Sequence, residues 1–269
     1  MISRGTAIFC GEGKKSNAQG AEKEHQLLEK ESPAWYSKKV YLSTLYIWSG
    51  KMVFEEKSRI VLEALSKIRI VPVLVLEEEN SGLRMCELLL ECGLPAAEIT
   101  FRTSAAAAII AKAAVKFPEL YLGAGTVLNC ADLHKAFDAG AKFAVAPGFN
   151  PAVVNEAVRC GFPFAPGVCT PSEIEQAMEL GCRFLKFFPA EAAGGVPMLK
   201  SLIAPYRHLG VRFMPTGGVT ADNVRNYLGL KEVAAVGGTW LGKADLIAAG
   251  EWEKIRATVK AAAELVKSL

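Results

Sequence analysis

Arg183-Phe-Leu-Lys-Phe-Phe-Pro-Ala-Glu191 is a short apolar stretch with a lysine at its centre. In an extended strand alternate side chains share a face, so Lys186 lies between Phe184 and Phe188 on the same side. Burial there would disfavour the charged ammonium, and a neutral amine is the nucleophile that forms a Schiff base. The same pattern also fits a lysine whose aliphatic chain packs on the phenylalanine rings while its ammonium group reaches water. The stretch predicts a buried strand and leaves the role of the lysine open.

The sequence on both sides of this stretch repeats one pattern, a short apolar run followed by an amphipathic segment of helical period. The strands expected from it are residues 70–76, 97–103, 121–127, 143–147, 164–168, 183–189, 212–216 and 233–236. Eight strand and helix units within roughly 200–250 residues predict an α/β protein built as a single (β/α)8 TIM barrel. An open doubly wound sheet would need a glycine-rich turn after an early strand, and residues 75–80 contain no glycine.

Residues 1–51 do not share this pattern. Residues 11–30 are polar and charged, and they are expected to carry little fold of their own. Residues 40–48 are rich in β-forming side chains and indicate a strand or a docking segment. We therefore expect an N-terminal extension over 1–51, with no assigned function, and the barrel over 52–269.

The composition excludes several classes of protein. The 31 Lys and Arg residues exceed the 28 Asp and Glu residues by 31 − 28 = 3, too small a surplus to indicate nucleic acid or an anionic membrane as a partner. The 7 cysteines have neither the paired spacing of a zinc site nor that of a disulfide framework. No apolar run approaches the length of a membrane span. We expect a cytoplasmic protein with no metal and no cofactor.

The polar residues at the carboxyl ends of the expected strands are the candidates for chemistry, because barrel enzymes build their active sites there. Histidine is scarce, with His25 in the extension and His134 and His208 on helices or loops, so neither a histidine base nor a histidine metal site is expected. Glu98 is the one acidic residue inside the expected core strands. It would serve either as a salt-bridge partner of Arg102 or as a general acid and base near Lys186.

Two glycine pairs follow neighbouring strands, in Thr216-Gly-Gly218 and Gly237-Gly-Thr239. Barrels often bind a phosphate after their last two strands, where glycines let backbone N–H groups approach the anion. Tight turns alone would also account for the glycines. Arg102 is the candidate for binding a substrate carboxylate, because its guanidinium can donate two parallel hydrogen bonds.

Six motifs together resemble one enzyme family from about residue 55 to the carboxyl terminus. They are Glu98-Ile-Thr-Phe-Arg-Thr103, Gly123-Ala-Gly-Thr-Val127, Ala146-Pro-Gly-Phe149, Lys186-Phe-Phe-Pro-Ala-Glu191, Pro215-Thr-Gly-Gly218 and Gly237-Gly-Thr-Trp240. Their order is that of the 2-keto-3-deoxy-6-phosphogluconate (KDPG) and 4-hydroxy-2-oxoglutarate (KHG) aldolases. The resemblance implies a metal-independent class I aldolase, usually a homotrimer, that releases pyruvate from a 2-keto acid.

The resemblance also implies a role for each matching residue. Lys186 forms the Schiff base and Glu98 moves protons. The substrate-binding residues are expected to be Arg102 and Thr126 at the carboxylate, Pro147 and Phe188 packed around it, and Gly217, Gly218 and Thr239 at the phosphate. Thr239 stands where relatives often have serine, which keeps the hydroxyl, and residues 1–51 lie outside the family pattern.

Other functions fit parts of the same pattern. The phosphate elements favour KDPG or its galactonate epimer over KHG as the substrate. A phosphosugar isomerase or epimerase would use the same phosphate site without forming an imine. A barrel that only binds or assembles would have no need for Lys186, Glu98 and Arg102 together at its mouth.

Overall fold

The computed structural model describes residues 38–269, with side chains from Gly50 onward. Its first element is the helix α2, Lys38–Ile68. The strand expected at residues 40–48 is therefore wrong, because these residues are helical, and the alternative of a docking segment stays a prediction. Strand propensity is weak without a partner strand, and the two leucines in the same segment favour a helix. The expectation for residues 11–30 lies outside the described residues, and the domain limits 1–51 and 52–269 stay predictions.

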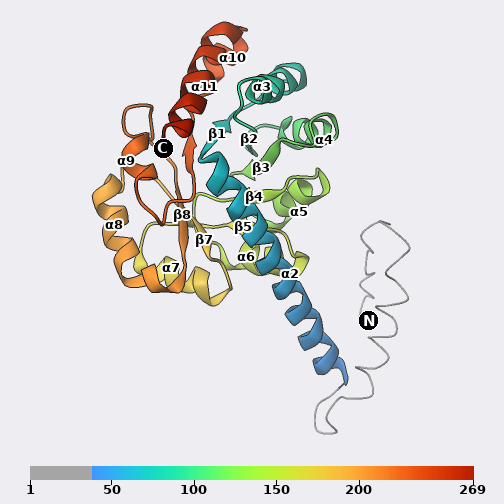
Figure 1. Cartoon of the computed structure of the whole chain (residues 1–269). Coiled ribbons are helices and arrows are strands. Elements are labelled where there is room, and N and C mark those ends of the chain that lie inside the picture. Colours follow the sequence, from blue (N-terminus) through green and yellow to red (C-terminus); the bar gives the residue numbers. More distant parts are fainter. Residues whose placement is uncertain (1–37) are drawn as a thin grey trace. The chain divides into compact units, whose positions relative to one another are not determined.

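Parallel strands form a closed ring (Figure 1). They are β1 Ile70–Leu74, β2 Ala96–Thr100, β3 Tyr121–Gly125, β4 Phe143–Val145, β5 Phe164–Ala165, β6 Gly167–Val168, β7 Phe184–Phe187, β8 Arg212–Pro215 and β9 Val236–Gly238. β5 pairs with β4 and β6 with β7, so these two pieces are one strand interrupted at Pro166, which has no N–H to donate. β1 pairs with both β2 and β9, and bridges at Phe213–Val233 and Thr216–Gly237 join β8 to β9. The expected (β/α)8 barrel is confirmed.

Most strands are shorter than expected from the sequence, and two of the differences bear on the motifs. β2 ends at Thr100 rather than at residue 103, because the chain turns toward the next helix, which leaves Arg102 beyond the strand. The last strand is β9 at Val236–Gly238 rather than 233–236. Its pairing with β1 starts only at Val236, although Val233 already bridges to Phe213. The first shift places Arg102 and Thr103 in the loop after β2, and the second places Gly237 and Gly238 in β9, with Thr239 directly after it.

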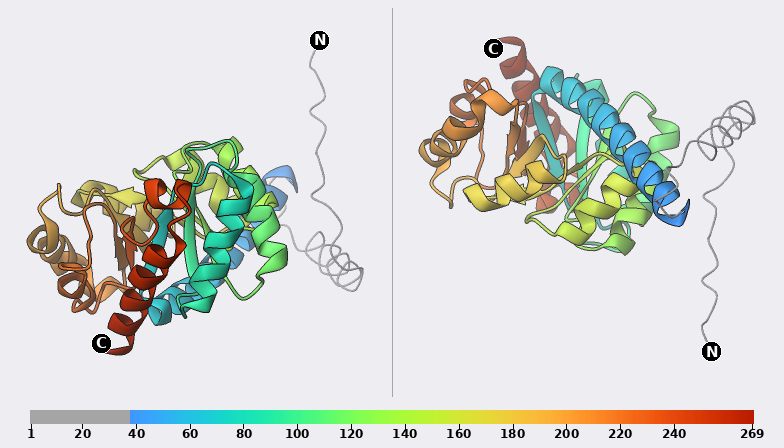
Figure 2. Two further views of the ribbon diagram at one scale, coloured as in Figure 1. Left: turned by 90° about the horizontal axis from the view of Figure 1, so that it is seen from above. Right: turned by 90° about the horizontal axis from the view of Figure 1, so that it is seen from below.

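Helices surround the ring of strands (Figures 1 and 2). They are α3 Glu79–Glu91, α4 Ala106–Lys116, α5 Cys130–Asp138, α6 Pro151–Cys160, α7 Pro171–Glu179, α8 Gly195–Tyr206, α9 Val224–Leu228, α10 Ala244–Ala248 and α11 Trp252–Lys267. α5, α6 and α7 begin at side-chain caps from Asn129, Asn150 and Thr170, which accept hydrogen bonds from backbone N–H groups of the first turn. None of the helices within residues 38–269 has both the length and the apolar character needed to cross a membrane.

The part of α2 from Ser49 onward covers the amino-terminal end of the barrel. Val61 and Leu65 of this helix pack with Phe143 and Phe184, which lie at the starts of β4 and β7, in an apolar cluster of buried residues. The view from below in Figure 2 shows α2 crossing the ring. Because this end of the barrel is closed by apolar side chains, a polar cavity can open only at the opposite, carboxyl end.

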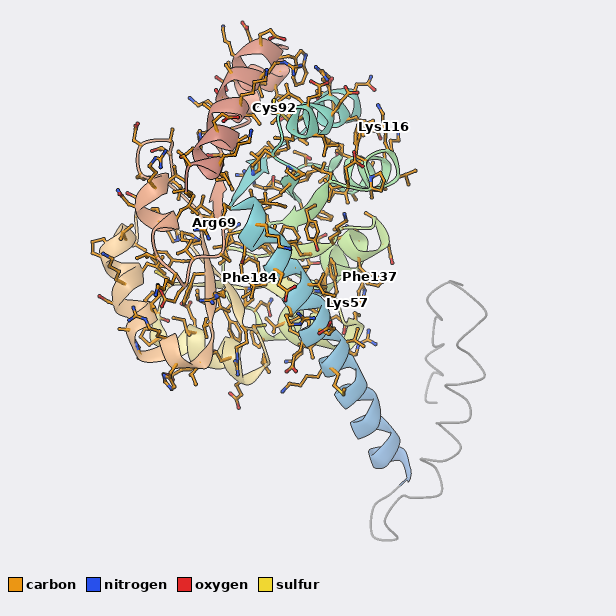
Figure 3. The ribbon with its side chains drawn as sticks, in the orientation of Figure 1. Lys57, Arg69, Cys92, Lys116, Phe137 and Phe184 are labelled. Carbon is orange, nitrogen blue, oxygen red and sulfur yellow. The ribbon has the colours of Figure 1, made fainter. Side chains whose placement is uncertain are left out.

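Arg69 ties the junction of α2 and β1 to the last strands (Figure 3). Its Nη1 donates to the carbonyls of Val233 and Ala234 at 2.9 and 3.0 Å, and its Nη2 donates to the carbonyl of Leu228 at 2.6 Å. Arg69 has a φ of 68°, an uncommon conformation for a residue with a side chain. Burial lowers the pKa of its guanidinium. These bonds fasten the point at which the ring of strands closes.

Arg69→Met should lower the free energy of unfolding by about 2–4 kcal/mol, because it removes three hydrogen bonds from a charged donor while keeping a β-carbon on the same backbone. The midpoint of urea unfolding measures this loss. Arg59→Met is the matched control, since Arg59 pairs only with exposed Glu56 and Glu63 and should contribute little. Equal midpoints for the two variants would contradict the role given to Arg69.

Candidate active site

A cavity of about 160 Å³ opens at the carboxyl ends of the strands. The residues expected from the sequence to act on the substrate all line it: Lys186, Glu98, Arg102, Thr126, Pro147, Phe188, Gly217, Gly218 and Thr239. They come from most of the strands or from the loops that follow them, so closure of the barrel brings them together. The fold thus converts six separate motifs into one cavity.

Lys186 and Glu98 form a buried ion pair across the barrel. The Nζ atom of Lys186, on β7, lies 2.8 Å from Oε1 and 3.2 Å from Oε2 of Glu98, on β2. Only 6% of the lysine side chain and 1% of the glutamate side chain are exposed. Removing both charges from water is costly, and their mutual attraction offsets that cost only in a close and well-formed pair. Such a pair holds a proton between two groups that can exchange it.

Gly125 provides the space for Glu98. It is the last residue of β3 and pairs in register with Thr100 on β2. A β-carbon at Gly125 would lie 2.3 Å from Oε1 of Glu98, far closer than any real contact. Any other residue at this position would therefore push the carboxylate away from Lys186.

Arg102 lies at the exposed mouth of the cavity rather than against Glu98. Its Nε is 3.4 Å from Oγ1 of Thr100, whose hydroxyl donates to the carbonyl of Leu74 at 3.0 Å. The ion pair that Glu98 makes is with Lys186, so the salt bridge between Glu98 and Arg102 that the sequence left open is not formed. The guanidinium is placed to meet an anion that enters the cavity.

Phe188 and Thr126 shape the wall beside the amine. The Nζ atom of Lys186 lies 5.8 Å from the centre of the Phe188 ring, within range of a cation–π contact. Thr126 has a φ of 59°, in the left-handed region that residues with a β-carbon rarely adopt. Backbone strain of this kind is concentrated at functional sites. Here it turns Thr126 into the cavity directly after β3.

The loop after β8 forms the other end of the cavity. Gly217 and Gly218 have φ angles of 99° and 80°, which only glycine adopts readily. A β-carbon at Gly218 would lie 2.6 Å from the β-carbon of Glu191. The Glu191 N–H donates to the carbonyl of Gly217 at 3.0 Å, and the Glu191 carboxylate accepts a hydrogen bond from Tyr227. Burial and the nearby carboxylate raise the pKa of Tyr227, so its hydroxyl stays a donor and the loop is held in place.

The remaining lining residues were not predicted to contact the substrate individually, although two of them stand in the glycine-pair motifs; they are Val73, Thr100, Thr216, Val219 and Gly237. Thr216 is the clearest omission, because it is buried and its Oγ1 lies 2.3 Å from where a β-carbon at Gly237 would be. The sequence feature that could have identified Thr216 was its position directly before the Gly217-Gly218 pair. Thr100 could have been found from its alternation with Glu98 on one face of β2.

Comparisons with known proteins identify the family of this chain. Residues 61–258 match the model of the KDPG and KHG aldolase family. The 2-dehydro-3-deoxy-phosphogluconate aldolase of Haemophilus influenzae is 40% identical over 207 residues, which cover 77% of this chain and 97% of that protein. The KHG/KDPG aldolase of Escherichia coli K12 is 39% identical over 198 residues, covering 74% and 92%.

A solved structure is similar in its fold as well. KDPG aldolase from Legionella pneumophila, in a crystal structure with pyruvate captured as a covalent carbinolamine intermediate, is 34% identical. It superposes with a TM-score of 0.71 over 75% of this chain and 97% of that one. With the family model and the two relatives, this places the protein among the KDPG and KHG aldolases, and it is an aldehyde-lyase.

Proposed function

We propose that this enzyme cleaves KDPG to pyruvate and glyceraldehyde 3-phosphate through a Schiff base on Lys186. The observation that carries the proposal is the buried pair of Lys186 and Glu98 in a cavity that also contains Arg102 and the glycine loop. The names of the relatives support the substrate, and the pyruvate carbinolamine of the Legionella enzyme supports covalent capture of a keto acid. The reaction needs no metal and no cofactor, because the imine itself accepts the electrons of the broken bond.

Imine formation begins with transfer of a proton from the Lys186 ammonium to the Glu98 carboxylate, 2.8 Å away. The neutral amine then attacks the C2 ketone and forms a C–N bond. Glu98 returns its proton to the carbinolamine hydroxyl, which leaves as water. The product is a protonated imine, an electron sink next to the C3–C4 bond.

Cleavage uses the same carboxylate a second time. Glu98, directly or through a water, takes the proton of the C4 hydroxyl, and the C3–C4 electron pair moves into the iminium. The aldehyde leaves and a pyruvate enamine remains on Lys186. Protonation at C3 and hydrolysis release pyruvate and restore the amine.

The substrate is held at both ends in this proposal. Arg102 and Thr126 bind the carboxylate, and Pro147 and Phe188 pack around that end. The phosphate is bound by backbone N–H groups of Gly217 and Gly218 and by the Thr239 hydroxyl. These glycines lie beyond β8, where barrels commonly bind phosphate.

KHG is a second candidate substrate, because the Escherichia coli relative is named for both reactions. A retro-aldol assay with KDPG, its galactonate epimer and KHG separates the three, and we expect KDPG to have the highest kcat/KM. We also propose a homotrimer, on the family resemblance, which light scattering coupled to gel filtration can test.

Borohydride reduction in the presence of pyruvate should add one reduced pyruvate to the wild type and none to Lys186→Met, as measured by intact mass. Lys142→Met is the matched control, because Lys142 is a half-buried lysine whose pKa is lowered by burial. It lies outside the cavity, so its variant should trap pyruvate like the wild type. A pyruvate adduct that persists in Lys186→Met would contradict the assignment of Lys186 as the Schiff-base lysine.

Glu98→Gln should retain imine formation better than turnover. A positioned general base contributes roughly 10²–10⁴-fold, so kcat for KDPG should fall by that amount while trapping with pyruvate continues at a reduced rate. Turnover comes from a coupled assay of pyruvate release. A variant that turns over at the wild-type rate would show that Glu98 does not move the protons.

Thr239→Val should lower kcat/KM for the phosphorylated substrate about tenfold, the equivalent of one hydrogen bond. The unphosphorylated analogue of KDPG is the internal control, since its cleavage should not change. Equal losses for both substrates would place the hydroxyl outside the phosphate site.

A further inference from the structure

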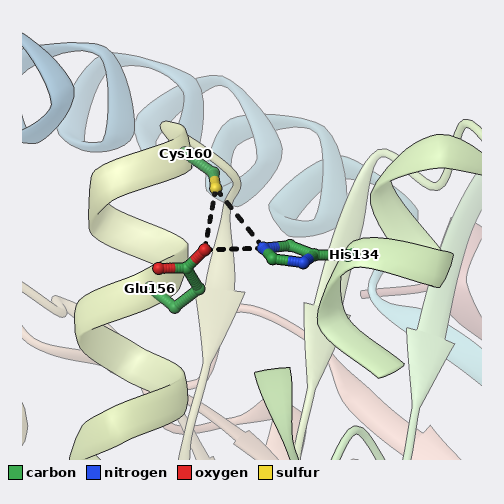
Figure 4. A group of neighbouring side chains, drawn as sticks. All are labelled: His134, Glu156 and Cys160. Atoms are coloured by element: carbon green, nitrogen blue, oxygen red, sulfur yellow. Dashed lines mark hydrogen bonds and ion pairs between the residues drawn. The ribbon is translucent and has the colours of Figure 1, made fainter. Parts of the chain in front are cut away.

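A group of three side chains lies on the outer helical layer, away from the cavity (Figure 4). His134 belongs to α5, while Glu156 and Cys160 belong to the neighbouring α6. Nε2 of His134 is 2.6 Å from Oε1 of Glu156, and Sγ of Cys160 is 3.6 Å from that oxygen and 4.0 Å from that nitrogen. Within the described residues this is the one cluster of at least three histidine, cysteine and acidic side chains with converging ligand atoms.

We propose that His134, Glu156 and Cys160 bind a zinc ion, with a water as the fourth ligand. Zinc takes nitrogen, oxygen and sulfur ligands together and prefers a tetrahedral arrangement. Bond lengths of about 2.0–2.3 Å imply ligand atoms about 3.4–3.6 Å apart around the metal. The observed separations of 2.6, 3.6 and 4.0 Å reach this geometry through shifts of less than 1 Å. The hydrogen bond between His134 and Glu156 is replaced by two metal bonds.

The alternative chemistry for these residue types is a cysteine nucleophile with a histidine base. Such a triad needs one ring nitrogen facing the thiol and the other facing the carboxylate. Here both Cys160 and Glu156 face the same nitrogen, Nε2. A shared nitrogen cannot accept a proton from the thiol while donating one to the carboxylate. Convergence on one point is instead what a metal ion requires.

The side chains around the group orient the carboxylate and leave the group accessible. Arg159 forms an ion pair with the Glu156 carboxylate. Nε of Arg159 holds Oε2 at 2.7 Å, the kind of hydrogen bond that orients a ligating carboxylate. Arg159 also donates to Oε1, and this bond must loosen when the metal binds. Cys160 is the last residue of α6, where the helix dipole favours a cation.

The site would join two neighbouring helices of the barrel rather than take part in the aldol reaction. Glu156 and Cys160 are four residues apart and so share one face of α6. The side chain of His134 is 48% exposed, which leaves room for a metal and its water to enter. Zinc bound here would stabilise the folded enzyme, because ligands from both helices meet only after folding.

The test is titration of the full-length, metal-stripped enzyme with Co²⁺, followed by competition with Zn²⁺. The wild type should bind one Co²⁺ with a thiolate-to-cobalt charge-transfer band that Zn²⁺ abolishes. Cys160→Ala should lose the band. His134→Gln should weaken Zn²⁺ binding by more than about 100-fold, beyond the loss typical of an outer hydrogen-bond partner. Pyruvate trapping on Lys186 should continue in both variants and so show that they fold.

Two control variants test whether the charge-transfer band comes from Cys160 and His134. Cys130→Ala removes another half-buried cysteine on the same helix as His134 and should keep the band. The double variant Cys10→Ala and His25→Gln should also keep it, because the three proposed ligands belong to α5 and α6. No band in the wild type, or an unchanged band and Zn²⁺ affinity in Cys160→Ala, would show that the group is only an ion pair.

Discussion

The close contact between the Lys186 ammonium and the Glu98 carboxylate is the interaction on which the rest of the site depends. Two charges that are 6% and 1% exposed persist only because they face each other at 2.8 Å. Neither side chain could be buried without the other, since a lone charge in the barrel would be strongly destabilising. The pair also stores the proton that imine formation must remove. One contact thus links the stability of the barrel interior to its reactivity.

The remaining architecture protects this contact. α2 and its apolar cluster close the amino-terminal end of the ring, so water reaches the pair only from the carboxyl end. Gly125 leaves the space into which Glu98 fits, and the glycines after β8 leave backbone N–H groups near the mouth. Arg69 closes the ring of strands at the far end. Structural roles gather at one end of the barrel and chemical roles at the other, as in other enzymes of this fold.

The sequence predicted the fold and nine of the residues that line the cavity, because strand periodicity and the order of the motifs can be read without knowing the contacts. It left the partner of Glu98 open between Arg102 and Lys186, since Lys186 lies 88 residues away and only barrel closure brings the two together. The strand predicted at residues 40–48 was wrong because a high β-propensity produces a strand only where a partner strand is available for pairing. His134, Glu156 and Cys160 show no ligand spacing along the chain, since His134 is 22 residues from Glu156 on a different helix. Packing of α5 against α6 alone makes them neighbours.

The most direct measurement of the central claim is exchange of the pyruvate methyl protons in D₂O, followed by NMR. Exchange requires both capture of the ketone by the amine and reversible proton transfer at C3 of the enamine. The account predicts rapid exchange with the wild type, a much slower rate with Glu98→Gln and none above background with Lys186→Met. Exchange at the wild-type rate in Lys186→Met would contradict it, because the enamine would then form without the buried amine.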